Sequence, residues 1–174
     1  MKKIVIFIFI LTLILINNTT SKAIEIPHDS IRIRVIANSN TELDQKVKGE
    51  VRKSLQDEIA SLLKDTKNIE EVREILTKNI KDFHITVEKT MNKNNYNEVF
   101  HINYGLNYFP EKEFKGIIYE EGYYESIVVT IGKGEGDNWW CVLFPPLCLM
   151  EHEESSMNEV EYKSFIMEVI DKFF

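Results

Sequence analysis

The chain contains few cysteines and histidines and has no excess of positive charge. Lysine and arginine number 21 against 28 acidic residues, which gives a net charge of −7 over 174 residues. This balance argues against binding to nucleic acid or to an anionic membrane through bulk attraction. The charged residues are scattered along expected helix faces and form no polyacidic tail, so we interpret the acidity as solubilising.

Sequence motifs of known enzyme classes are also missing. No G-x-S-x-G segment offers a serine nucleophile, and no CxxC or HxxxH spacing offers a metal site. Gly132, Gly134 and Gly136 follow an expected strand, but no helix that could cradle a phosphate opens after them. We therefore predict no catalytic residues, no metal and no cofactor.

The residue types that are scarce elsewhere are concentrated between Gly132 and Cys148. This segment holds both tryptophans, both cysteines, two of the four prolines and three of the seven glycines. Glycine permits close backbone approach, tryptophan offers a large apolar face with one donor, and Pro-Pro is stiff. Such a mixture indicates a binding surface, because a simple connecting loop does not need these residue types together. The residues predicted to bind a partner are Asn138, Trp139, Trp140, Pro145 and Pro146.

The two tryptophans, Trp139 and Trp140, are adjacent on an expected strand, where neighbouring side chains point to opposite faces. We expect one of them to enter the core and the other to face outward. The outward ring would be a credible anchor for a protein partner. An alternative is that it stacks on a sugar, which would make the chain a glycan-binding module.

The only two cysteines, Cys141 and Cys148, allow several interpretations. In an exported protein such a close pair suggests a disulfide, and the alternative is two buried thiols packed as small apolar groups. Zinc bound by these cysteines with His152 and His101 has no supporting ligand spacing. A cell-wall hydrolase with Cys141 as nucleophile and a histidine as base is a further alternative, without a surrounding signature.

The amino-terminal residues have the pattern of an export signal. Lys2 and Lys3 precede an apolar run from Ile4 to Ile16, which is shorter than the roughly 20 residues of a membrane-spanning helix. Small residues at Ser21 and Ala23 suit cleavage after Ala23. We predict that residues 1–23 are a signal peptide or, if uncleaved, a membrane anchor and the only contact with a membrane. Residues 24–174 then form a single exported domain.

Periodicity predicts a strand and two helices in the first half of the exported part. Apolar residues alternate over 31–35, with Arg32 and Arg34 expected to face solvent. A capping box of Ser39 and Glu42 should begin a helix, whose apolar stripe recurs every three or four residues. That stripe consists of Leu43, Val47, Val51, Leu55, Ile59 and Leu62. A second helix should begin after Asn68 and extend to Ile80.

The second half alternates with period two over four further segments. We predict strands over 83–87, 102–108, 114–119 and 124–131, with a loop over 92–97. Since the later connections are too short for crossover helices, these strands should pair antiparallel, mostly as a meander. An amphipathic helix over 160–173 closes the chain. The predicted fold is a single α+β domain with a largely antiparallel sheet and amphipathic helices on one face.

Two blocks of the sequence resemble the stage II sporulation protein R family of endospore-forming bacteria. The first is IRIRVIANSN, residues 31–40, followed by Asp44, Gln45, Lys48, Val51 and Arg52. The second begins at EGYYE, residues 121–125, and continues through VVTIGKGEGDNWWCVLFPPLC, residues 128–148. The region around Met91 to Asn97 departs from the family pattern.

The resemblance implies a signalling protein and not an enzyme. It implies export from the forespore into the space between the forespore and mother-cell membranes. There the protein would stimulate a membrane-bound aspartic protease of the mother cell, which processes a sigma-factor precursor. The resemblance supplies no contact residues, so the interface stays assigned to Asn138–Trp140 and Pro145–Pro146, with the turn at Gly132, Gly134 and Gly136. The stoichiometry is not fixed by the sequence.

Overall fold

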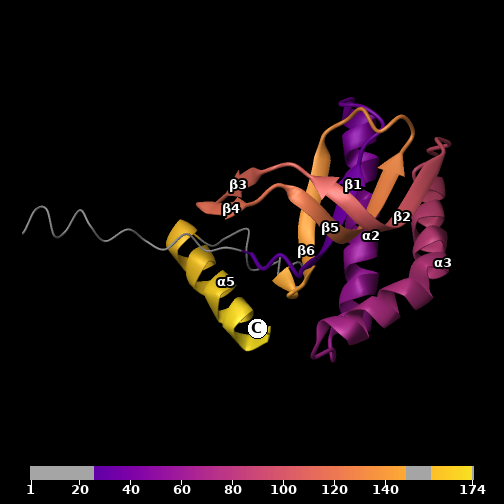
Figure 1. Cartoon of the computed structure of the whole chain (residues 1–174). Helices are drawn as coiled ribbons and strands as arrows, with labels where there is room; N and C mark the ends of the chain where they lie inside the picture. Colours follow the sequence, from indigo (N-terminus) through magenta and orange to yellow (C-terminus); the bar gives the residue numbers. More distant parts are fainter. Residues whose placement is uncertain (1–25, 148–157, 174) are drawn as a thin grey trace, which may run out of the picture.

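The computed structural model describes residues 26–147 and 158–173 (Figure 1). The helices are α2 (Glu42–Leu63), α3 (Ile69–Lys93) and α5 (Glu159–Phe173). The strands are β1 (Ile31–Ile36), β2 (Phe100–Phe109), β3 (Lys112–Phe114), β4 (Ile117–Tyr119), β5 (Gly122–Ile131) and β6 (Asn138–Phe144). The predicted α+β class is confirmed.

A four-stranded sheet with the order β2-β5-β1-β6 forms the centre of the molecule. β2 and β6 pair antiparallel with their neighbours, whereas β1 runs parallel to β5. The predicted meander is wrong, because the segment over 114–119 forms a separate two-stranded sheet and β1 lies between β5 and β6. The residues from Gly132 to Asp137 carry the chain over β1, a lateral step of about 10 Å that six residues can span.

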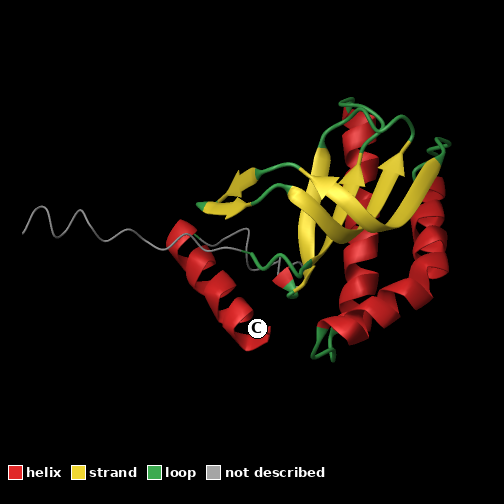
Figure 2. Ribbon diagram, viewed as in Figure 1, coloured by secondary structure: helices red, strands yellow, loops and turns green. Residues whose placement is uncertain are grey.

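Two long helices cover one face of the sheet (Figure 2). The stripe predicted for α2 is confirmed, since Val47, Val51, Leu55 and Ile59 are fully buried. Its first member is not part of the core: Leu43 is 53% exposed. The helix also begins differently from the prediction, because Thr41 and not Ser39 is the N-cap, with the Thr41 hydroxyl accepting from the Asp44 N–H at 3.2 Å.

α3 is longer than predicted and absorbs the expected strand over 83–87. Phe83 and Val87 are fully buried, while Ile85 is 45% exposed, as helical and not alternating geometry requires. No glycine or proline interrupts residues 69–93, so nothing stops the helix after Ile80. The predicted cap is confirmed, because the Asn68 side chain accepts from the Glu71 N–H at 3.0 Å.

A second apolar cluster lies apart from the main core. The segment expected as one strand over 114–119 is a hairpin, β3 paired with β4, which turns at Lys115 and Gly116 with positive φ. The predicted carboxy-terminal helix is confirmed as α5, and it packs on this hairpin and on β6. The cluster consists of Ile26, Ile117, Val142, Leu147, Tyr162, Ile166 and Val169.

The two arginines of β1 do not lie in solvent as predicted. They do project from the face opposite α2 and α3, but Arg32 is only 3% exposed and Arg34 is half-buried. Aromatic rings of neighbouring strands cover them, Tyr124 and Phe109 over Arg32 and Trp140 beside Arg34.

The predicted leader, residues 1–23, lies outside the described residues. Across residues 26–147 and 158–173, no helix combines the length and the apolar character that crossing a membrane requires.

Candidate functional site

The glycine-rich turn packs on the loop that follows β1. We call this contact the Asn–Gly junction, formed by residues 37–41 and 132–137. The Asn38 side chain accepts from the Lys133 N–H at 2.9 Å, and the Asn38 carbonyl accepts from the Glu135 N–H at 3.1 Å. The Asn40 side chain accepts from the Asp137 N–H at 2.7 Å. The loop after β1 thus accepts from the backbone donors of a turn that lies almost a hundred residues away in sequence.

The predicted turn glycines are explained by this contact. Gly132 has φ of 55° and Gly134 has φ of 67°, in the region that favours glycine. At Gly136 the constraint is space, because an added Cβ would lie 2.3 Å from the Ser39 carbonyl oxygen. An added Cβ at Gly132 would lie 2.2 Å from the Asn38 side-chain oxygen. The glycines therefore permit close packing of the turn on the Asn-Ser-Asn loop.

A buried carboxylate fixes the loop from beneath. Asp44, in the first turn of α2, accepts hydrogen bonds from the Ser39 hydroxyl, the Tyr96 hydroxyl and, at 3.1 Å, the Asn38 side-chain amide. These bonds, that from Ser39 above all, hold the pKa of Asp44 below its ordinary value. Burial, reinforced by the bond to Asp44, raises the pKa of Tyr96, which stays a neutral donor.

Two further α2 side chains connect the helix to the junction. The Gln45 amide donates to the Ser39 carbonyl at 2.9 Å and to the Asn40 side chain at 3.0 Å. The Lys48 ammonium donates to the Asp137 carbonyl at 3.1 Å. Asp44, Gln45 and Lys48 all belong to the first block of the family resemblance, which was the available signal, although sequence reasoning assigned them no role.

The tryptophans lie on opposite faces of β6, as alternation requires, but neither is fully inside or outside. Trp139 packs on the main core, with the Arg52 guanidinium carbon 5.2 Å from its ring centre. Trp140 faces the other side, where it meets Phe109 edge to face at 5.7 Å between ring centres. Both side chains are half-buried, and Asn138 beside them is half-buried too.

The cysteine and proline positions differ in what the structure describes. Cys141 is disulfide-bonded, whereas Cys148 lies outside the described residues. Pro145 is buried and Pro146 is half-buried, so the Pro-Pro pair lies against the protein and does not stand out as a corner. The bond at Cys141 leaves its sulfur without the free thiolate that a nucleophile needs.

The zinc alternative is not supported by the described residues. His101 projects from the open face of β2, while Cys141 faces the main core, and His152 lies outside the described residues. Within the described ranges, no three His, Cys, Asp or Glu side chains gather as a metal site would require.

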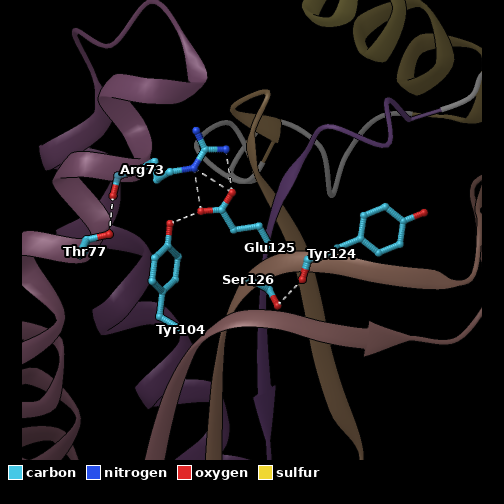
Figure 3. Close-up of polar contacts among 6 residues, drawn as sticks. All are labelled: Arg73, Thr77, Tyr104, Tyr124, Glu125 and Ser126. Atoms are coloured by element: carbon cyan, nitrogen blue, oxygen red, sulfur yellow. Dashed lines mark hydrogen bonds and ion pairs between the residues drawn. The ribbon is translucent and has the colours of Figure 1, made fainter.

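A polar bridge joins α3 to β5 at the other end of the helix face (Figure 3). The Arg73 Nε donates to both Glu125 oxygens at 3.0 Å, and Arg73 Nη2 donates to Oε2 at 2.8 Å. The Tyr104 hydroxyl donates to Oε1 of the same carboxylate. Burial opposes the charge of Glu125, but the bonds from Arg73 and Tyr104 outweigh it and hold the Glu125 pKa below its usual range. Sequence reasoning did not find this bridge, although Glu125 closes the EGYYE block.

The fold and the junction define a small α+β domain whose most distinctive sequence blocks, at 37–48 and 132–140, form one hydrogen-bonded structure at the end of a mixed sheet. The family described as Stage II sporulation protein R matches residues 27–154, and the chain belongs to that family. The match contains every strand, α2 and α3, and ends before α5.

The chain is also similar to Stage II sporulation protein R of Bacillus subtilis (strain 168). The two are 35% identical over 135 residues, which is 78% of this chain. The aligned part is 60% of the length of the Bacillus protein, so the chain spans less than two thirds of that relative. No solved structure is significantly similar to this chain.

Proposed function

We propose that this sporulation protein is an exported signal, released from the forespore into the space between the two membranes. There it activates a membrane-bound aspartic protease of the mother cell, which then processes a sigma-factor precursor. The observation that carries the proposal is the family match over 27–154, with both sequence blocks of the family joined in the Asn–Gly junction.

Export is supported by the sequence of the first 23 residues. Two lysines followed by a short apolar run and small residues at Ser21 and Ala23 have the order of a signal peptide. The disulfide bond at Cys141 also suits a compartment outside the reducing cytoplasm.

The proposed mechanism is binding that selects an active state of the protease. A ligand shifts such an equilibrium only if it binds the active state more tightly than the inactive one. A surface that is already rigid loses little conformational entropy on binding. The junction has this property, because the Asn38 and Asn40 side chains hold the backbone of the glycine turn and Asp44 holds the Asn38 side chain.

The structure offers no support to the two alternative functions. A cysteine hydrolase needs a free thiolate, and Cys141 is bonded. A glycan platform needs an open aromatic face, and both tryptophans are half-buried against other side chains. We therefore retain the signalling role as the single proposal.

Reconstitution tests the proposal directly. Residues 24–174 would be purified and added outside vesicles that hold the protease with its catalytic side and precursor enclosed. Processing should increase with added protein and saturate, whereas boiled protein should have no effect. Absence of processing with a folded domain and a demonstrably active protease would contradict the proposal.

Asn40 provides a point variant for the same assay. In Asn40→Ala the turn loses its acceptor for the Asp137 N–H while the core is untouched, so signalling should fall with the fold retained. The matched control is Asn92→Ala, an exposed amide near the carboxy-terminal end of α3, which should signal normally. Equal activity of both variants would remove the junction from the mechanism.

A further inference from the structure

Cationic and aromatic side chains alternate on the face of the sheet turned away from α2 and α3. We call them the outer cluster, and its members are Arg32, Arg34, Lys112, Phe109, Tyr124 and Trp140. The period of two along β1 puts both arginines on this face, and the register pairs Arg34 with Trp140 on β6. β6 is an edge strand, so the Trp140 side of the cluster lies at the rim of the sheet.

The rings and the cations contact one another closely. The Arg32 guanidinium carbon lies 3.3 Å from the ring centre of Tyr124. The Arg34 carbon lies 5.4 Å from the ring of Trp140, and the Lys112 ammonium lies 5.1 Å from the same ring. Such contacts hold the charges in place but do not neutralise them.

The cluster has no counter-charge in the part of the chain that the structure describes. No carboxylate there forms an ion pair with Arg32, Arg34 or Lys112, whereas Arg73 on the helix face is fully paired with Glu125. Burial alone accounts for the lowered pKa of Arg34. Partly buried cations without a counter-ion are unusual, because desolvation is normally offset by pairing. In a chain of net charge −7 this face is a local exception.

Several buried polar atoms of the same face have no hydrogen-bond partner within residues 26–147 and 158–173. They are Arg32 Nη2, Arg34 Nε, Trp140 Nε1 and Asn138 Oδ1. Arg32 is only 3% exposed, so its charge acts on the face without contacting solvent. Arg34 is half-buried, which leaves the rest of its guanidinium within reach of a ligand. Buried polar atoms without a partner are rare in native proteins, so their concentration here makes this face unusual.

We propose that the outer cluster binds carboxylate groups of an acidic, extended segment of a protein partner. The half-buried guanidinium of Arg34 presents its outer N–H groups, which match a carboxylate with two parallel N–H···O bonds, and the exposed Lys112 ammonium supplies a further donor. Arginine and tryptophan are also the residues that dominate protein interfaces. Arg32 is buried and does not contact the bound carboxylate, but its charge adds positive electrostatic potential at this face. This binding goes beyond the proposed function, because it requires an acidic bound segment whichever protein carries that segment.

A peptide titration tests the binding chemistry without the protease. The probe is a fluorescein-labelled peptide Gly-Glu-Val-Glu-Val-Glu-Gly, titrated with residues 24–174 at low salt and followed by anisotropy. Saturable binding is expected, and a peptide with lysine in place of glutamate should not bind. Arg34→Gln should weaken binding about 10-fold or more, the loss typical of a charged hydrogen-bonded pair.

Further variants separate binding from folding. Trp140→Phe keeps an aromatic ring but reduces the apolar face beside Arg34 and Lys112, so it should weaken binding of the glutamate peptide severalfold, and its melting temperature reports any change in folding. Lys81→Gln removes the same charge from an exposed site on α3 and should bind as the unmodified domain does.

Several outcomes would overturn the inference. One is the absence of saturable binding up to about 1 mM peptide. Another is equal peptide affinity of Arg34→Gln and Lys81→Gln. A third is displacement of the labelled peptide by inorganic phosphate as effectively as by the unlabelled glutamate peptide. Self-association that Arg34→Gln abolishes, seen by sedimentation without peptide binding, would assign the face to a second copy of the chain.

Discussion

Single residues of the Asn–Gly junction are constrained by space more than by chemistry. Gly136 illustrates this, because the Ser39 carbonyl occupies the position next to a side chain. The residue identity is thus required by the loop that it contacts, which is almost a hundred positions away.

Gly136→Ala should therefore destabilise the domain. The added methyl would meet the Ser39 oxygen at 2.3 Å, and separating the two loops should lower the free energy of unfolding by roughly 1–3 kcal/mol. Gly49→Ala is the matched control, since nothing lies within 4 Å of its added Cβ. In the interior of α2 that change should stabilise by about 0.5–1 kcal/mol. Urea unfolding of both variants measures the difference, and equal stabilities would show that the contact is dispensable.

Asp44 makes the junction sensitive to acid. Its pKa is lowered in the folded state, chiefly by the bond from Ser39, so its contribution is fully present above the ordinary carboxyl pKa of 3.8. That contribution is lost as the pH falls through the lower folded-state value. Asp44→Asn should cost about 1–3 kcal/mol at neutral pH. The gap between wild type and variant in urea unfolding should narrow below about pH 4, and a gap independent of pH would contradict the assignment.

At the scale of elements, the Arg73–Glu125 bridge fixes where α3 lies on the sheet. It joins the first half of the helix to the start of β5, and Tyr104 on β2 adds a third element to the same carboxylate. The Arg73 side chain is 41% exposed, so solvent screens much of the attraction.

A double-mutant cycle with Arg73→Gln and Glu125→Gln should give a coupling of about 1 kcal/mol, because bidentate geometry raises the value above that of ordinary surface pairs. The coupling should decrease at high salt, since the pair is partly exposed. The control pair is Lys81 with Glu125, which should show no coupling. An Arg73–Glu125 coupling near zero would mean that apolar packing alone positions α3.

The elements that sequence could predict are those whose pattern fits one geometry. The α2 stripe and the strand over 124–131 have this property. Residues 80–91 do not, because Ile80, Phe83, Val87 and Met91 fit a helix while Phe83, Ile85 and Val87 fit a strand. The absence of glycine and proline from 69–93 was the information that decides between them.

Long-range pairing explains what could not be predicted. Short connections predicted a meander of successive strands, but the β3–β4 hairpin forms its own sheet and β1 pairs with both β5 and β6. The arginines of β1 were expected in solvent for the same reason, because their burial depends on Tyr124 and Trp140 from two other strands. For the candidate site, composition identified the turn and the tryptophans. The Asn38, Asp44 and Tyr96 side of the junction required the tertiary structure.

At the scale of the whole molecule, two surfaces differ in their position and in their hydrogen bonding. The Asn–Gly junction lies at the end of the sheet and is held by internal hydrogen bonds, whereas the outer cluster lies on the face turned away from α2 and α3 and contains polar atoms without a hydrogen-bond partner among the described residues. A rigid loop pair next to a cationic face gives one domain both a fixed shape and a charge preference. β6 connects them, since it begins at Asn138 beside the junction and carries Trp140 in the outer cluster.

The disulfide at Cys141 should therefore support stability without taking part in signalling. If Cys148 is the other half, the closed loop is short, and its loss should lower the free energy of unfolding by about 2 kcal/mol on the loop-entropy model. Cys141→Ser, paired with Cys148→Ser, should melt at a lower temperature yet trigger processing fully at a temperature where it is folded. Iodoacetamide labelling before and after reduction reports the bond itself. A folded double variant without signalling activity would mean that this sulfur pair belongs to the functional surface or to a catalytic centre, and the division of roles between β6 and the junction would have to be redrawn.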